Sequence, residues 1–125
     1  MDYKIEAQTY LIEARKGQTT SVVLHATQNL EKILYEKKLN PTEIGTNYSE
    51  IKGISKKAYK HDCLHWLRIL RKKNSLSAIQ KFENLRIVGG FSYADLGTSR
   101  FELIVRKIMA RFNSKKTVKI YKAHH

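Results

Sequence analysis

The chain has 125 residues, 42% of them hydrophobic, which suits one compact unit or two very small ones that share a core. Its 24 Lys and Arg against 11 Asp and Glu give a formal net charge of +13. A surplus of this size favours a polyanionic partner, which is DNA, RNA or an acidic membrane. The single cysteine, Cys63, excludes an internal disulfide framework and fits a reducing cytosol.

Membrane and export signals are missing from the sequence. No stretch approaches the roughly 18–20 consecutive apolar residues of a membrane helix, and residues 1–6 show no signal-peptide pattern. We therefore expect a cytoplasmic protein with no membrane partner.

The first 26 residues allow two interpretations. Residues 10–15 and 19–24 carry β-branched residues on either side of Gly17, which favours a β-hairpin. Residues up to Lys16 also fit a short helix that Gly17 ends. We favour the hairpin. From residue 27 to 38, Leu30, Ile33 and Leu34 form one stripe, which predicts a helix that ends at Asn40-Pro41.

A supersecondary unit is repeated after residue 45. Residues 47–53 and 92–97 are each predicted to form a short helix that ends in glycine, and Ser55 and Ser99 each open a longer helix, to about Lys72 and Phe112. The apolar stripes of the long helices have the same spacing. They are Tyr59, Cys63, Trp66, Leu67 and Leu70 in the first copy, and Phe101, Val105, Ile108, Met109 and Phe112 in the second.

Two segments complete the second copy. Leu76, Ile79, Phe82 and Leu85 predict a helix before it, and residues 117–122 alternate like an edge strand after it. We therefore expect a mainly α fold with small β hairpins or wings, namely two winged helix-turn-helix units in one compact body. The expected division is residues 1–74 and 75–125, and the expected state is a monomer that works as an internal pseudo-dimer.

Residues 92–100, followed by an amphipathic helix, resemble the helix-turn-helix of bacterial regulators, and residues 47–57 have the same look, although the turn of this first copy is three residues longer. Residues 115–121 are similar to a wing. Two winged units in a short basic chain resemble the TraN-like DNA-binding accessory proteins of Gram-positive conjugative type IV secretion systems, and excisionase-like proteins in style. The resemblance implies a role in plasmid transfer and contacts with other transfer proteins.

The polar sides of the two long helices are the candidate DNA-binding surface, because a recognition helix presents its N-terminal residues to base edges in the major groove. Arg100 and Arg106 suit guanine, Glu102 suits cytosine or the orientation of an arginine, and Ser99 suits a helix cap. Lysines suit phosphates. We expect double-stranded DNA to contact Ser55, Lys56, Lys57, Lys60, His61, His65, Arg71, Lys72, Ser99, Arg100, Glu102, Arg106, Lys107, Lys115, Lys116 and Lys119, with two helices in adjacent major grooves.

Other kinds of site are weaker in this sequence. His61 and His65 are four residues apart, but a zinc ion needs a third ligand and Cys63 lies on the core stripe, so we expect no metal and no cofactor. No catalytic constellation stands out, and we expect no enzyme. The alternatives are a small basic ribonuclease toxin that uses His61 or His65, an RNA-binding protein, and a membrane-surface adaptor.

Overall fold

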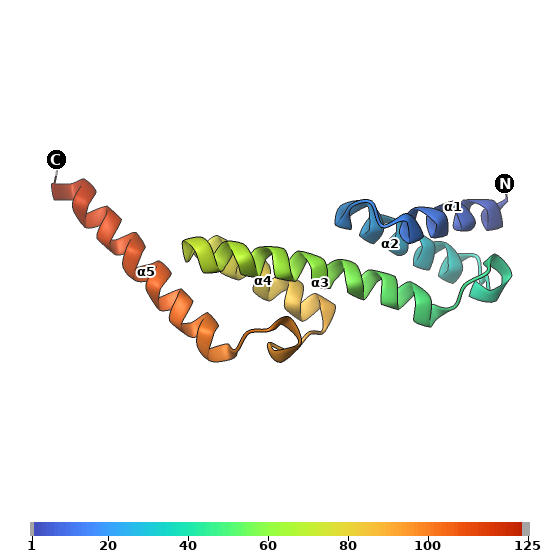
Figure 1. Cartoon of the computed structure of the whole chain (residues 1–125). Coiled ribbons are helices and arrows are strands. Elements are labelled where there is room, and N and C mark those ends of the chain that lie inside the picture. The colour runs from blue at the N-terminus through green and yellow to red at the C-terminus, as the bar shows by residue number, and fades with distance from the viewer. Residues whose placement is uncertain (1, 124–125) are drawn as a thin grey trace. The chain divides into compact units, whose positions relative to one another are not determined.

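The computed structural model describes the backbone of residues 2–123 and the side chains of residues 2–112. Its elements are α1 (Tyr3–Lys16), α2 (Thr20–Glu36), the 3₁₀ turn η1 (Pro41–Ile44), α3 (Tyr48–Lys73), α4 (Leu76–Gly89), the 3₁₀ turn η2 (Ala94–Leu96) and α5 (Arg100–Ala123) (Figure 1). The chain divides into two compact units, Met1–His61 and Asp62–His125, which join within α3.

The described residues contain no strand, so the predicted winged helix-turn-helix fold is wrong. The expected hairpin of residues 10–24 is replaced by α1 and α2, with Gly17 in the left-handed conformation (φ 60°) at the end of α1. This is the helical alternative, in which glycine ends a helix at no steric cost. The expected wing strand, residues 117–122, lies in the last turns of α5.

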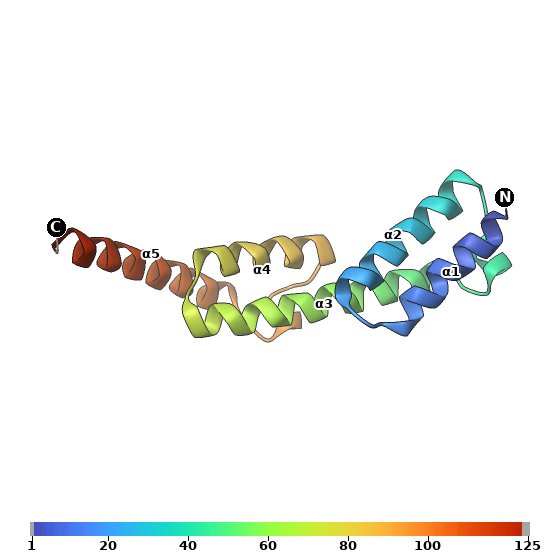
Figure 2. The ribbon, with the colours of Figure 1, turned by 90° about the horizontal axis from the view of Figure 1, so that it is seen from above.

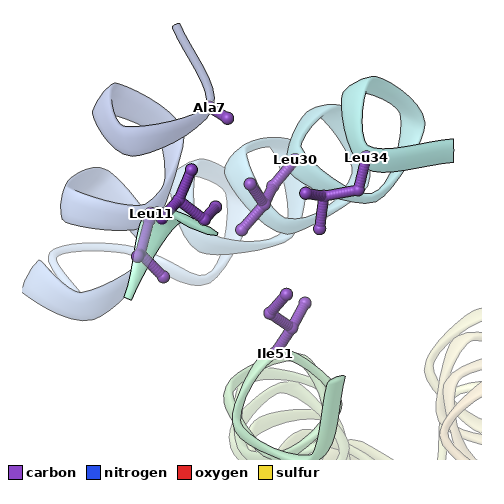
Figure 3. Close-up of a cluster of buried hydrophobic side chains, with 6 residues drawn as sticks. Ala7, Leu11, Leu30, Leu34 and Ile51 are labelled. Carbon is purple, nitrogen blue, oxygen red and sulfur yellow. The ribbon is translucent and has the colours of Figure 1, made fainter. Parts of the chain in front are cut away.

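The core of the first unit lies between α1, α2 and the start of α3. α1 and α2 lie side by side and run antiparallel (Figures 1 and 2). Leu11 on α1, Leu30 and Leu34 on α2 and Ile51 on α3 are buried against one another (Figure 3). Full burial of one such side chain stabilises a fold by about 1.5–3 kcal/mol. These contacts therefore hold the N-terminal half of α3 against the antiparallel helices α1 and α2.

The second unit repeats this arrangement with the C-terminal half of α3, α4 and the start of α5. Cys63, Leu67 and Leu70 on α3 are buried, as the predicted stripe of this helix requires. Ile79 and Phe82 of α4 are buried too, and Leu103 is the first buried residue of α5. The predicted helix that begins at Leu76 is therefore confirmed as α4, although Leu76 itself is exposed.

The two units are two copies of one motif. The buried residues Ala7, Leu11 and Ala14 of α1 correspond to Cys63, Leu67 and Leu70 of α3, each 56 positions later. Thr19 caps α2 through the amide of Val22, and Ser75 caps α4 through the amide of Ala78, with the same shift. In each copy, the third helix follows a 3₁₀ turn and a left-handed glycine, Gly45 or Gly97.

The same four-part hydrogen-bonded cluster closes each copy. In the first unit, Arg15 donates to the carbonyl oxygen of Gly45 at 2.9 Å and to Glu50 Oε1 at 2.6 Å, and Thr46 Oγ1 donates to the same carboxylate. In the second unit, Arg71 donates to the carbonyl oxygen of Gly97 at 3.0 Å and to Glu102 Oε1 at 2.7 Å, and Thr98 takes the place of Thr46. Each arginine thereby ties the last turn of one helix to the start of the third.

The repeat differs in alignment from the one that we predicted. Residues 92–103 correspond to residues 40–51, whereas the prediction aligned residues 92–97 with residues 47–53. The predicted helix end at Gly53 and the turn after it are wrong, because α3 runs from Tyr48 to Lys73 without a break. Ser55 therefore lies within a helix, and Asn47 stands at the start of α3, where its side chain accepts from the amide of Glu50 at 2.8 Å. The predicted short helix of residues 92–97 is a single 3₁₀ turn.

Candidate functional site

A row of lysines occupies the outer side of the N-terminal half of α3. Lys52, Lys56 and Lys60 are all exposed. At 3.6 residues per turn they fall within about 80° of arc, roughly opposite to the buried residues Ile51 and Ala58. We call these three residues the α3 lysine row. Glu50 is the only carboxylate between residues 48 and 61, and it is bound by Arg15 and Thr46.

The corresponding side of α5 is apolar. A shift of 52 positions places Phe101 at Ser49, Ile104 at Lys52, Val105 at Gly53, Ile108 at Lys56 and Phe112 at Lys60. Phe101 is 74% exposed, Ile108 60% and Phe112 64%. The predicted core stripe of the second long helix is therefore wrong, because all of its side chains except the half-buried Val105 are exposed, namely those of Phe101, Ile108, Met109 and Phe112. Leu103 and Ala110 face the core of the unit instead.

The candidate residues of the first copy lie on two parts of α3. Lys56 and Lys60 belong to the lysine row, whereas Ser55 is only half-exposed within the helix. Lys57 and His61 line an open hollow of about 480 Å³ beside the start of α2, together with Thr20, Arg15 and Glu50. His61 Nδ1 lies 3.4 Å from Thr20 Oγ1.

The hollow brings together the side chains that a ribonuclease would need, namely a histidine, a lysine and a carboxylate. The carboxylate, however, already has partners. Hydrogen bonds from Thr46 and Arg15 lower the pKa of Glu50 below its usual value. Glu50 is therefore held ionised as part of the cluster that closes the first unit, and it is a poor proton donor at neutral pH.

The candidate residues of the second copy separate into exposed and internally bonded groups. Ser99 caps α5 by accepting from the amide of Glu102 at 3.1 Å, so its predicted role as a helix cap is confirmed. Arg100 and Lys107 are exposed. Arg106 donates to the carbonyl oxygen of Arg71 at 3.0 Å and to Asn74 Oδ1 at 3.1 Å.

Glu102 lies at the centre of the internally bonded group. Its carboxylate is 2.7 Å from Arg71 and 3.6 Å from Arg106. Hydrogen bonds from Arg71 and then from Thr98, together with the charges of Arg71 and Arg106, lower the pKa of Glu102 to about 2. Of the two roles that we expected for Glu102, the orientation of an arginine is the one that this geometry performs.

The remaining candidate residues lie on the C-terminal half of α3 and in the later turns of α5. Lys72 and His65 are exposed on the C-terminal half of α3, and the His65 ring meets the edge of Trp66 at a centroid distance of 5.4 Å. The side chains of Lys115, Lys116 and Lys119 lie outside the described residues.

Two further classes of site have no support in the described part of the chain. Among residues 2–112, no three His, Cys, Asp or Glu side chains are grouped so that they could hold a metal ion. None of the described helices is both long enough and apolar enough to cross a membrane.

The comparisons add no identification. The chain matches no protein-family model, no curated protein and no solved structure. The likeness to TraN-like proteins depended on two winged units, and the described residues contain no wing. It stays a prediction from the sequence.

Two features of the site were missed from the sequence. The predicted short helix of residues 47–53 separates Lys52 from Lys56 and Lys60, although the three lysines are spaced four residues apart. The predicted core stripe of the second long helix places the outward side of α5 in the core. One repeated pattern in the sequence identifies both features. Gly45-Thr46 is followed by Glu50 in the first copy, and Gly97-Thr98 is followed by Glu102 in the second. This pattern aligns α5 with the start of α3.

Proposed function

We propose that the protein binds duplex DNA, mainly through its phosphates, and that the α3 lysine row is the principal contact surface. The observation that carries the proposal is this row of three exposed lysines on the side of the helix that faces away from the core. The net charge of +13 supports it, because a polyanion is the partner that such a surplus favours.

The geometry of the row suits a duplex. Lys52 and Lys60 are eight residues apart, which is about 12 Å along a helix. A single helix fits a major groove about 12 Å wide and can place charged side chains along its edges. Lysine is a flexible point charge that suits phosphates rather than bidentate contacts with bases. We therefore propose binding with little sequence preference through this row.

The second unit offers a smaller basic surface for the same partner. Arg100 and Lys107 are exposed on one flank of α5, whereas Arg71 and Arg106 are engaged within the unit. Arg100 is accordingly the arginine that we propose for any contact with a base, since an exposed guanidinium can donate two hydrogen bonds to guanine.

The test is the affinity for a labelled DNA duplex after Lys52, Lys56 and Lys60 are all changed to Gln. Each phosphate contact that is lost should reduce the slope of log affinity against log salt by about 0.9, so the slope should fall by between two and three. The matched control changes Lys16, Lys32 and Lys38 to Gln, which are exposed lysines of the same unit outside α3. An equal effect of both triple variants would contradict a specific role for the row.

The hollow beside α2 supports one competing function, cleavage of RNA by His61. Incubation of the purified chain with RNA tests this function directly. If the chain cleaves RNA, if His61→Ala abolishes this cleavage, and if the chain does not bind duplex DNA, then ribonuclease activity is the better account of its function. We expect no cleavage, because Glu50 is committed to Arg15 and Thr46.

A further inference from the structure

The outward side of α5 carries a continuous apolar seam. Phe101, Val105, Ile108 and Phe112 are spaced four, three and four residues apart, which is the spacing of core positions in paired helices. They lie opposite to Leu103 and Ala110, the residues of α5 that face the core of its own unit. We call these four residues the α5 seam. The seam therefore contributes little to the core of the second unit.

The repeat shows that the fold does not require apolar residues at these positions. In the first unit the same four positions hold Ser49, Gly53, Lys56 and Lys60, and the unit has the same three helices and the same Arg–Glu cluster. A contiguous run of exposed apolar side chains that the fold does not require marks an interaction surface. The difference between the copies thus points to a partner for α5.

We propose that the α5 seam pairs with the α5 seam of a second copy of this chain in a two-fold symmetric dimer. Such an interface is self-complementary, because each copy supplies the same patch. Exposed phenyl side chains contribute on the order of 150 Å² each, so the seam as a whole reaches the size of about 400–500 Å² that marks interaction surfaces. Two seams together bury about 1,000 Å², which is the lower limit for a specific interface.

The residues beside the seam favour a second copy over a charged partner. Ile104 and Met109 extend the apolar surface on its two sides, and both are more than 40% exposed. Glu102 is bound by Arg71, and Arg111 is the only basic residue directly beside the seam within residues 100–112. Arg100 and Lys107 lie farther round the helix. Within residues 100–112, two copies can therefore meet along the seam without placing their basic residues face to face, despite a net charge of +13.

The test is the molar mass of the whole chain in solution, measured by sedimentation equilibrium at concentrations above and below about 10 µM. An interface of this small size should begin to dissociate in this range. We expect the wild-type chain to shift from one to two copies as its concentration rises. The double variant Phe101→Glu with Ile108→Glu should weaken the association by at least about 100-fold and stay a monomer.

The matched control, Gln8→Glu with Gln28→Glu, adds the same two negative charges at exposed positions of the first unit and should dimerise like the wild type. Helix content by circular dichroism checks that each variant folds. Phe101 is the second residue of α5, where a carboxylate favours the helix, so loss of the dimer would not come from a broken helix. A wild-type monomer at every concentration, a dimeric Phe101–Ile108 double variant, or equal dissociation of the control would each overturn the proposal.

Discussion

At the scale of single residues, the carboxylate of Glu102 has partners from two helices and from the segment that precedes α5. It accepts hydrogen bonds from Arg71 and Thr98 and lies 3.6 Å from Arg106. These partners lower the pKa of Glu102 to about 2. A folded-state pKa below the ordinary value near 4.5 means that the ion pairs stabilise the fold at neutral pH, and that this stability is lost as the pH falls from about 4.5 toward 2.

We predict that Glu102→Gln lowers the free energy of unfolding at pH 7 by about 1–2 kcal/mol, after allowance for the screening of a partly exposed pair by water. The same change should flatten the fall in stability between about pH 5 and pH 2. Urea titrations at several pH values measure both effects. Glu31→Gln, an exposed residue of α2, serves as the control and should change neither. An unchanged pH profile for Glu102→Gln would show that the cluster is not coupled to folding.

The buried thiol of Cys63 gives a second prediction at this scale. Cys63 is fully buried, and desolvation, with the nearby charge of Asp62, raises its pKa to about 11. At pH 8 the thiol is therefore protonated and shielded, and a thiol-specific reagent should not label the native chain. Labelling should be complete in denaturant. Rapid labelling of the native chain at pH 8 would show that Cys63 does not lie in the core.

At the scale of elements, Gly53 decides between a continuous α3 and the predicted turn. Gly53 has a helical backbone, and an added Cβ would meet nothing within 4 Å. Gly53→Ala should thus stabilise the chain by about 0.5–1 kcal/mol. Gly97, at φ 73°, ends η2 in the left-handed region, so Gly97→Ala should destabilise it by about 1–2 kcal/mol. Thermal or urea unfolding compares the two variants, and destabilisation by Gly53→Ala would contradict a continuous α3.

Helices α3, α4 and α5 show which parts of the fold the sequence can predict. Periodicity predicted α4 and the buried stripe of α3, because apolar residues recur there at helical spacing. It failed at α5, where two apolar sides, Leu103 with Ala110 and Phe101 with Ile108, compete for the core. Only tertiary contacts decide between them. Gly53 misled for a related reason: glycine ends many helices, but a long helix packed along its length tolerates one.

The hairpin prediction failed because local residue preference and tertiary packing disagree. Thr20, Val22 and Val23 prefer strands, yet Val23 is buried in a helix. Thr19 supplies the cap that begins this helix, and Gly17 ends the one before it. These two signals, a helix-ending glycine followed by a helix-capping threonine, are visible in the sequence. In the structure they outweigh the strand preference of the β-branched residues.

At the scale of the whole molecule, the two copies of the motif have equivalent but separate cores and differ in their outward sides. The first presents the α3 lysine row and the second the α5 seam. The fold that the two units have in common requires neither surface. We therefore propose that the α3 lysine row contacts duplex DNA and that the α5 seam contacts a second copy of the chain. A dimer would carry two lysine rows, and contact of both rows with one duplex would raise the effective affinity without new kinds of contact.

The most direct test of this account is the affinity of the wild-type chain for a labelled DNA duplex, measured by fluorescence anisotropy from about 50 to about 200 mM salt. Contact with about six to ten phosphates predicts that the affinity falls by roughly a thousand-fold or more over this range. An affinity that barely changes with salt, or an absence of binding at the lowest salt, would contradict the proposal that the protein holds DNA through its lysines.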